Sequence, residues 1–269
     1  MSSAFSLGFS WFKDSCRTLK LQPLAYTGIV VFSLLMSGLL SSLPLIGTLL
    51  ASLWMPFASV LTGFAARDVL AGRTPVYFTL IAIFRDKASR WPLLAVGILA
   101  SIWMELDMLV FQMMGQADLA QWKITAEGVD VESIAAHFPV GAFLTAFALY
   151  LPLLLMTLFA PLLIVQNRQS VIKSLFYSFF GTLRSLVPCL VWLVCVAALA
   201  FVIFLTIESI SIAAGGLMFF TFMAPIPLIS AVCQAGIWVM FRDIFASSRP
   251  DGEMPTDLDS DQAPPANGI

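Results

Sequence analysis

Residues 160–192 read APLLIVQNRQSVIKSLFYSFFGTLRSLVPCLVW, which joins two apolar runs through a polar break and a short amphipathic segment. The apolar residues of that segment recur at helical spacing and predict one apolar face, formed by Val171, Ile172, Leu175, Phe176, Phe179, Phe180 and Leu183. The opposite face is predicted to hold Lys173, Ser174, Ser178, Thr182 and Arg184. We expect this helix to lie in the membrane surface. Pro188 then opens a long apolar run, because the first turn of a helix does not need the N–H that proline lacks.

The same arrangement occurs twice more along the chain. An apolar helical face precedes Pro23 and is formed by Phe5, Phe9, Phe12, Cys16 and Leu19, beside the polar Lys13, Arg17 and Lys20. Residues 77–90, with Arg85, Lys87 and Arg90, precede Pro92. The sequence thus predicts three pseudo-repeats, each a cytoplasmic surface helix followed by a proline and a pair of spans. Such a repeat implies pseudo-symmetric packing but no particular function.

The composition is that of a polytopic membrane protein. Hydrophobic residues make up 59% of the 269 residues and charged residues only 11%, whereas soluble domains are about half apolar and about a quarter charged. A helical span needs roughly 20 apolar residues, and the chain offers six such runs, at 24–43, 45–66, 92–114, 139–165, 187–206 and 217–241. We therefore predict an all-α protein with six transmembrane helices, since these continuous runs lack the alternation of a β-barrel.

The basic residues are distributed unequally between the two sides of this predicted bundle. All but one of the 14 lysines and arginines lie before the first span, between spans two and three, between spans four and five, or after span six, and the exception is Lys123. Because basic loops stay in the cytoplasm, the positive-inside rule places both termini there. The apolar run after Lys20 is long and lacks a small-residue cleavage site, so we expect a retained anchor and not a signal peptide.

Two longer polar stretches lie outside the spans. Residues 115–138 form the predicted external loop, which can hold a short helix near residues 131–137 but is too small to bury a catalytic core. Residues 247–269 are rich in Pro, Asp and Ser, so we predict a disordered acidic tail after a transmembrane domain of residues 1–246. The four cysteines are Cys16, Cys189, Cys195 and Cys233, and all lie in or beside predicted membrane segments or on the cytoplasmic side. We expect no structural disulfide between them.

Glu105 and Asp107 are the first candidates for a functional site, because ionisable groups inside a span are costly and mark function by default. Counted from Pro92 at 1.5 Å per residue, Glu105 lies about 20 Å and Asp107 about 22 Å along the third span, within a hydrocarbon core about 30 Å thick. A separation of two residues points the side chains to different sides of a helix. The two carboxylates are therefore not expected to share a pocket.

Glu208 and His137, the single histidine, are predicted near the external ends of their helices and complete the candidate transport or ion site. Glu105, His137 and Glu208 are suitable ligand types for a metal or proton site, but their different predicted depths favour separate, water-facing carboxylates. The third span also contains Met104, Met108, Met113 and Met114. Methionines suit Cu(I), yet in an apolar helix they usually serve packing. We expect no metal site and no cofactor.

Pairs of opposite charges recur where the predicted spans meet the cytoplasm. Phe12-Lys13-Asp14, Phe84-Arg85-Asp86 and Phe241-Arg242-Asp243 share one pattern, and Arg67-Asp68 lacks only the Phe. We expect the long basic side chains to anchor helix ends at the membrane surface, with binding of lipid head groups as the alternative. The predicted membrane-surface contacts are Lys13, Arg17, Arg67, Arg85, Arg184 and Arg242.

Signatures of soluble enzymes are absent from the sequence. It contains no G-x-x-x-x-G-K-[ST], H-E-x-x-H or G-x-S-x-G motif, and a single histidine excludes a multi-histidine metal site. No stripe of basic and aromatic residues outside the membrane indicates nucleic-acid binding. The sequence therefore predicts a protein that is not an enzyme and has no nucleic-acid partner.

Two parts of the chain carry a family resemblance. Residues 160–166, APLLIVQ, and residues 174–188, with Arg184 and Pro188, resemble the YciC-like proteins of bacterial inner membranes and, more distantly, the membrane portion of membrane-anchored glycerophosphodiester phosphodiesterases. Residues 19–50, followed by ARDVLAG at 66–72, resemble a related family of uncharacterised proteobacterial six-span proteins. The resemblance implies a bacterial inner-membrane location and no established activity, because the soluble phosphodiesterase domain has no counterpart here.

The favoured hypothesis is a non-enzymatic membrane scaffold or regulatory subunit in envelope homeostasis or membrane-complex assembly. The expected partners are the lipid bilayer and other membrane proteins or further copies of this chain. The alternative is a small-solute or ion transporter that uses Glu105, which requires this carboxylate to face an internal cavity. A lipid-modifying enzyme needs paired catalytic groups near one membrane surface, and the sequence offers none.

Overall fold

The computed structural model describes residues 3–75, 82, 85–125, 128–213 and 225–246. It contains six helices long and apolar enough to cross a membrane, which confirms the predicted all-α polytopic architecture. They are α2 (Pro23–Ser41), α3 (Gly47–Leu70), α5 (Lys87–Leu119), α7 (Val140–Thr157) continued by α8 (Ala160–Asn167), α10 (Leu186–Ala213) and α12 (Pro225–Ala246). Shorter elements are the helices α1 (Ala4–Leu21), α6 (Val131–Ala136) and α9 (Val171–Arg184) and the antiparallel strands β1 (Ile124–Thr125) and β2 (Gly128–Val129).

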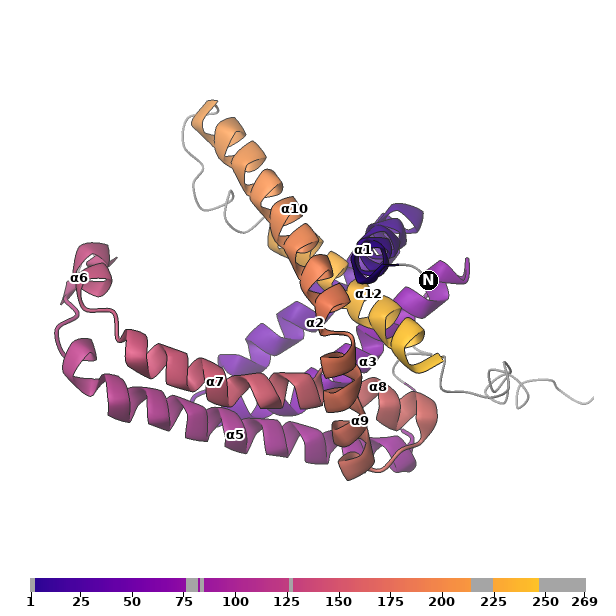
Figure 1. Ribbon diagram of the computed structural model, residues 1–269, viewed down its shortest axis with the longest axis horizontal. Helices are drawn as coiled ribbons and strands as arrows, with labels where there is room; N and C mark the ends of the chain where they lie inside the picture. Colours follow the sequence, from indigo (N-terminus) through magenta and orange to yellow (C-terminus); the bar gives the residue numbers. More distant parts are fainter. Residues whose placement is uncertain (1–2, 76–81, 83–84, 126–127, 214–224, 247–269) are drawn as a thin grey trace, which may run out of the picture.

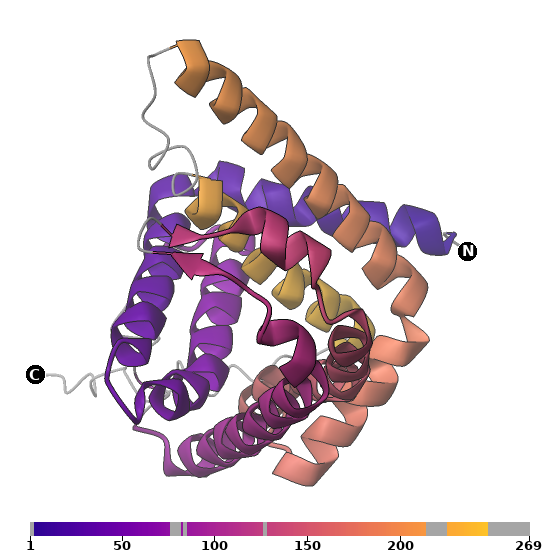
Figure 2. The same ribbon diagram turned by 90° about the vertical axis from the view of Figure 1, so that its left-hand side faces the viewer.

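Two helices lie across the bundle instead of along it. Helices α5 and α7 run side by side, α9 crosses one end of this pair, and α6 lies at the other end (Figure 1). Viewed along α5 and α7, α1 also extends across the bundle (Figure 2). The side that carries α1 and α9 also carries every described basic residue except Lys123, and we name it the basic side.

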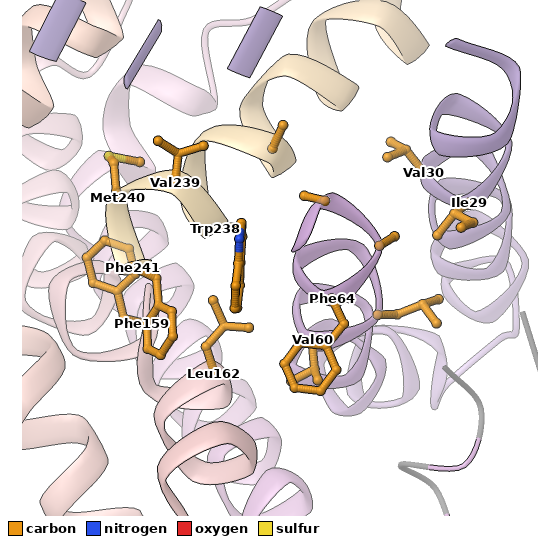
Figure 3. Close-up of a cluster of buried hydrophobic side chains, with 14 of the residues drawn as sticks. Ile29, Val30, Val60, Phe64, Phe159, Leu162, Trp238, Val239, Met240 and Phe241 are labelled. Atoms are coloured by element: carbon orange, nitrogen blue, oxygen red, sulfur yellow. The ribbon is translucent and has the colours of Figure 1, made fainter. Parts of the chain in front are cut away.

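The buried core lies in the half of the bundle nearest the basic side. Its side chains come mainly from the first half of α2, the second half of α3, the middle of α12 and α8. Trp238 of α12 packs edge-on against Phe64 of α3, with 6.1 Å between the ring centroids, and Leu162 of α8 lies beside them (Figure 3). Away from this core, α10 diverges from the α5–α7 pair in both views (Figures 1 and 2).

Helices α1 and α9 cover two of the predicted amphipathic segments, but the polar face assigned to α9 is partly wrong. Ser174, Ser178 and Thr182 are buried against the bundle, whereas Lys173 and Arg184 are exposed. Short hydroxyl side chains allow helices to approach closely and can bond to main-chain groups there. Long cations are rarely buried without a partner, so they lie on another face. The helix thus has a protein-facing, an apolar and a cationic face.

The third predicted surface helix, residues 77–90, is also corrected where the structure describes it. Residues 76–81 and 83–84 lie outside the described part, and Lys87–Arg90 form the start of α5. The Asp86 carboxylate caps this helix by accepting the main-chain N–H of Ala88 at 3.0 Å. Pro92 therefore lies inside α5 and does not open it. The threefold pseudo-repeat stays a prediction.

Several predicted boundaries differ from the helix ends. The fifth span was expected to end at residue 206, but α10 continues to Ala213 and includes Glu208. Residues 217–224, the predicted start of the sixth span, lie outside the described residues, as does the predicted acidic tail at 247–269. The division into a transmembrane domain and a disordered tail stays a prediction.

Candidate functional site

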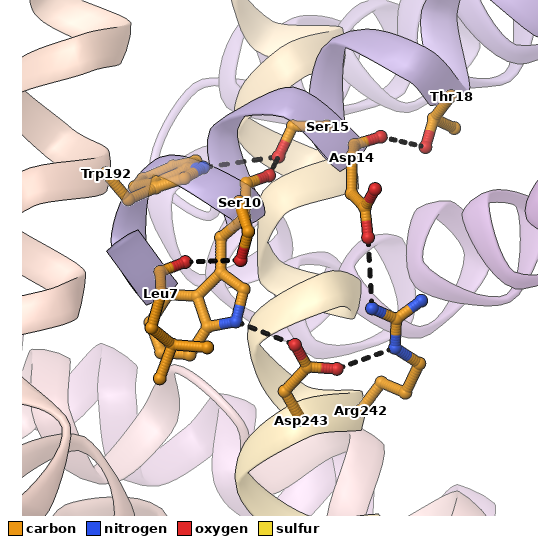
Figure 4. A network of polar contacts seen from close by, with 9 residues as sticks. Leu7, Ser10, Asp14, Ser15, Thr18, Trp192, Arg242 and Asp243 are labelled. Atoms are coloured by element: carbon orange, nitrogen blue, oxygen red, sulfur yellow. Dashed lines mark hydrogen bonds and ion pairs between the residues drawn. The ribbon is translucent and has the colours of Figure 1, made fainter. Parts of the chain in front are cut away.

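A polar network joins α1 to the end of α12 on the basic side (Figure 4). The guanidinium of Arg242 donates to Asp14 of α1 at 3.1 Å and to its neighbour Asp243 at 2.7 Å. The indole N–H of Trp11 donates to the other carboxylate oxygen of Asp243 at 2.9 Å. Hydrogen bonds between ionised groups are stronger than neutral ones. Arg242 is therefore a link between helices, in addition to any contact with the membrane surface.

Close packing of α10 reinforces this network. The indole N–H of Trp192 donates to the buried hydroxyl of Ser15 at 3.2 Å. A Cβ atom at Gly8 of α1 would lie 2.4 Å from the carbonyl oxygen of Pro188, and one at Gly236 of α12 would lie 2.2 Å from the Trp192 ring. Side chains other than hydrogen do not fit at these distances. The two glycines therefore let α1, α10 and α12 meet.

The other carboxylates of the recurring charged pairs also bind arginines. Asp68 is 3.1 Å from Arg67 and 3.0 Å from Arg73, and the Arg67 guanidinium lies 4.5 Å from the centre of the Phe64 ring. Arg67 is thus held by contacts within the protein, although we predicted it as a membrane-surface contact. The Asp68 side chain is only 14% exposed, so its two arginine partners compensate a largely buried charge.

Asp86 connects the start of α5 to the connection between α8 and α9. Its carboxylate accepts the Ser89 hydroxyl at 2.7 Å and also binds the guanidinium of Arg168. These bonds, led by that of Ser89, hold the pKa of Asp86 below its ordinary value. Arg168 has a left-handed main chain, with φ of 52°, at the C-terminal cap of α8. The ion pair therefore links the start of α5 to the turn between α8 and α9.

The hydroxyl of Ser178 in α9 bonds to main-chain groups at the break between α7 and α8. Helix α7 ends at Thr157 and α8 begins at Ala160, ahead of Pro161. The main-chain N–H of Phe159, which would bond to the carbonyl of Leu155 in a continuous helix, donates to the Ser178 hydroxyl at 3.0 Å. The Ser178 hydroxyl in turn donates to the Leu155 carbonyl at 2.8 Å. Both main-chain groups are buried, and one serine satisfies both.

The remaining predicted surface cations point outward. Lys13, Arg17, Arg85 and Arg184 are exposed, and the structure shows no ion pair for them within its described ranges. The ammonium of Lys13 lies 4.7 Å from the centre of the Phe9 ring. Of the six predicted membrane-surface residues, Arg67 and Arg242 thus pair with carboxylates and the other four are exposed. Their contact with a membrane surface stays a prediction.

Glu105 and Asp107 project differently from α5, as their spacing predicts. Glu105 is exposed in a shallow surface depression whose lining, which includes Ser101, Met108 and Gln112, comes from α5 alone. Asp107 is half-buried, and one of its carboxylate oxygens has no hydrogen-bond partner among the described residues. No enclosed cavity surrounds Glu105 in the described part of the chain. The transporter hypothesis, which requires such a cavity, gains no support from this placement.

His137 and Glu208 belong to separate parts of the molecule. The Nδ1 atom of His137 lies 3.2 Å from the Ser133 carbonyl at the end of α6, and its own carbonyl accepts the indole N–H of Trp122 at 3.0 Å. Glu208 lies on α10, whose C-terminal end is distant from α6 in both views (Figures 1 and 2). Where side chains are described, no three His, Cys, Asp or Glu residues form a possible metal site.

Sequence reasoning missed the role of Ser178 and the partners of the charged pairs. Pro161 is a local signal for a helix break, since proline disrupts a continuous helix. Nothing in the sequence indicates which hydroxyl satisfies the broken hydrogen bond. Likewise, Asp14 and Arg242 are separated by most of the chain. The charged pairs were recognisable, but their partners were not.

Comparison with known proteins finds a relative over nearly the whole chain. A Burkholderia thailandensis protein named "Probable inner membrane protein" is 26% identical over 255 residues, which cover 90% of this chain and 92% of that protein. No family model and no solved structure matches the chain. The resemblances to YciC-like proteins and to phosphodiesterase membrane domains stay predictions. The chain is a polytopic helical protein similar to a proteobacterial protein that bears an inner-membrane name.

Proposed function

We propose that this protein is a non-enzymatic, multi-pass inner-membrane protein that serves as a scaffold or regulatory subunit for another membrane protein. The name of the Burkholderia relative supports the inner membrane, and the six apolar helices support a multi-pass arrangement. The unequal distribution of basic residues in the sequence supports a cytoplasmic location for the basic side and for both termini, by the positive-inside rule.

The one-sided core is the observation that carries this proposal. Helices are joined tightly near the basic side, whereas α10 and the α5–α7 pair diverge beyond it (Figure 1). Phe201 and Val202 of α10 are 62% and 58% exposed, and Ile102 and Leu106 of α5 are 56% and 55% exposed. Lipid tails are as apolar as these side chains, so a partner helix must pack well against them to displace lipid. A rigid base with diverging apolar helices offers such packing surfaces.

Site-specific photo-crosslinking tests the proposal in living cells. A photoreactive amino acid at Val202 or Leu106 is expected to capture the same distinct membrane protein. Leu24 is the matched control, because it is 89% exposed but belongs to α2, at the packed end of the bundle. Deleting the gene is expected to lower the abundance of the captured protein. If neither position captures a distinct partner and the deletion leaves the envelope unchanged, the proposal fails.

A further inference from the structure

Helix α1 has three faces with different environments. Gly8, Trp11, Ser15 and Thr18 are buried against the bundle. Phe5 and Phe9 are 67% and 41% exposed on a second face. Lys13, Arg17 and Lys20 are all exposed, and their spacing of four and three residues places them on a third face. We name this third face the cationic face of α1. It adjoins the exposed apolar face.

The carboxylates of α1 and of the end of α12 are paired with groups outside the cationic face. Asp14, the single acidic residue of α1, is paired with Arg242 of α12. Asp243 is held by Arg242 and by the Trp11 indole. Among the residues that the structure describes, no ion pair reaches Lys13, Arg17 or Lys20. The positive charges of the cationic face are therefore not neutralised by described parts of the fold.

We propose that the cationic face of α1 binds the phosphate head groups of anionic phospholipids, while Phe5 and Phe9 insert among the acyl chains. A helix that lies across the bundle can reach head groups and acyl chains at once, because one face is apolar and the next is cationic. Lysine and arginine stems extend toward phosphates while their methylene groups contact apolar surface. The charge of the surface is complementary to an anionic leaflet, which selects lipid over a neutral partner.

The expected selectivity follows from the charge of these residues. A basic residue near an anionic surface contributes enough attraction for about a fivefold preference, and the effect falls with ionic strength. Three such residues should therefore favour anionic over zwitterionic lipid by more than tenfold at low salt. This inference does not depend on the scaffold role, since it concerns the lipids that contact the protein.

The test uses the full-length protein in nanodiscs of mixed phosphatidylglycerol and phosphatidylcholine. Spin-labelled versions of the two lipids report which one is retained at the protein surface. The wild-type protein should retain phosphatidylglycerol preferentially, and added salt should reduce this preference. The triple variant Lys13→Gln, Arg17→Gln, Lys20→Gln should lose most of it. All three side chains are exposed, so the variant should keep the thermal stability of the wild type.

A matched variant removes three other exposed cations, Lys87→Gln, Lys123→Gln and Lys173→Gln. It should retain most of the phosphatidylglycerol preference. An equal loss in both triple variants would show a general charge effect and overturn the assignment to α1. Absence of any preference in the wild type would overturn it as well. Because both leaflets of a nanodisc have the same composition, the outcome does not depend on membrane orientation.

The acidic C-terminal segment of the same chain is the competing occupant. Residues 247–269 contain four aspartates and one glutamate against one basic residue, Arg249. A variant that ends at residue 246 should retain the same lipid preference as the full chain if lipid occupies the cationic face. A preference that appears only after this truncation would assign the face to the C-terminal segment and overturn the proposal.

Discussion

The hydroxyl of Ser178 stands between the carbonyl of Leu155 and the N–H of Phe159, where a continuous helix would have one main-chain hydrogen bond. Ser178→Ala leaves both buried groups without a partner, which costs about 1–3 kcal/mol for each group. We expect a clear loss of thermal stability in detergent. Ser174→Ala is the control, because Ser174 is equally buried but bonds only to Val171 of its own helix. Equal losses in the two variants would contradict the bridging role.

Gly236 provides a second test at a single position. An alanine Cβ there would lie 2.2 Å from the Trp192 ring, so Gly236→Ala should force α10 and α12 apart and cost about 1–3 kcal/mol. Gly38→Ala should be neutral or stabilising by up to about 1 kcal/mol, because no heavy atom lies within 4 Å and alanine favours a helix. Thermal unfolding measures both. A smaller ring, Trp192→Phe, should partly rescue Gly236→Ala.

The stability of the protein should depend on pH through the carboxylate of Asp86. Its pKa is lowered in the folded protein, chiefly by the Ser89 hydroxyl and also by Arg168, from an ordinary value of 3.8. Such a carboxylate stabilises the fold above its unfolded pKa and loses that contribution as the pH falls through its folded pKa. Asp86→Asn should therefore be less stable than the wild type at neutral pH, by at most about 1 kcal/mol because the pair is largely exposed.

The difference between wild type and Asp86→Asn should shrink below about pH 4, because the wild-type carboxyl becomes protonated there. Thermal unfolding at several pH values measures the difference. Asp118→Asn is the control, since Asp118 has no described ion pair. A difference that persists unchanged in acid would show that Asp86 acts through its shape and not its charge.

The attachment of α1 to the bundle can be followed through Cys16. Burial raises the pKa of this thiol, and Lys20 lowers it to a smaller extent, so the thiol is largely protonated and weakly reactive at neutral pH. Arg242→Gln removes the ion pair between α12 and Asp14 of α1, and also the pair that holds Asp243 within α12. If these links contribute about 1 kcal/mol, maleimide should label Cys16 about fivefold faster in this variant.

That labelling requires a protein in which Cys189, Cys195 and Cys233 are replaced by alanine. Arg184→Gln is the matched control, because it makes the same chemical change at an exposed residue without a described ion pair. An unchanged rate in Arg242→Gln would show that the Trp11 and Trp192 hydrogen bonds and the close packing at Gly8 are enough to hold α1. The ion pair with Asp14 would then not be needed for the attachment of α1.

Periodicity predicted α1 and α9 because each helix has an apolar stripe that can be recognised without knowledge of its neighbours. Periodicity could not predict which of their polar residues are buried against the protein and which are exposed. Ser174 and Lys173 are adjacent and both polar, yet one is buried and the other exposed. Side-chain size and a bonding partner on another helix decide this difference. The start of α5 was also missed, because a proline commonly opens a helix, whereas Pro92 lies inside α5.

Across the whole molecule, solvent access at position 105 distinguishes a surface carboxylate from a transport site. In a version without the native cysteines, we expect Glu105→Cys to react with membrane-impermeant reagents from one side, regardless of added solutes or ions. Lys123→Cys should react from the same side, and Lys20→Cys from the opposite side, since Lys123 follows the C-terminal end of α5 and Lys20 belongs to α1, on the basic side. Labelling of Glu105→Cys that changes with a solute or ion would favour the transporter.

The local chemistry of the chain was enough to establish six apolar helices and the clustering of basic residues on one side. The requirements for spanning a bilayer apply to each segment almost independently, because a span must be long, apolar and internally hydrogen-bonded whatever its neighbours are. The one-sided core, the bridge at Ser178 and the link from Arg242 to Asp14 emerge only on folding. They join groups far apart in the chain, and their energies depend on distances that packing alone creates.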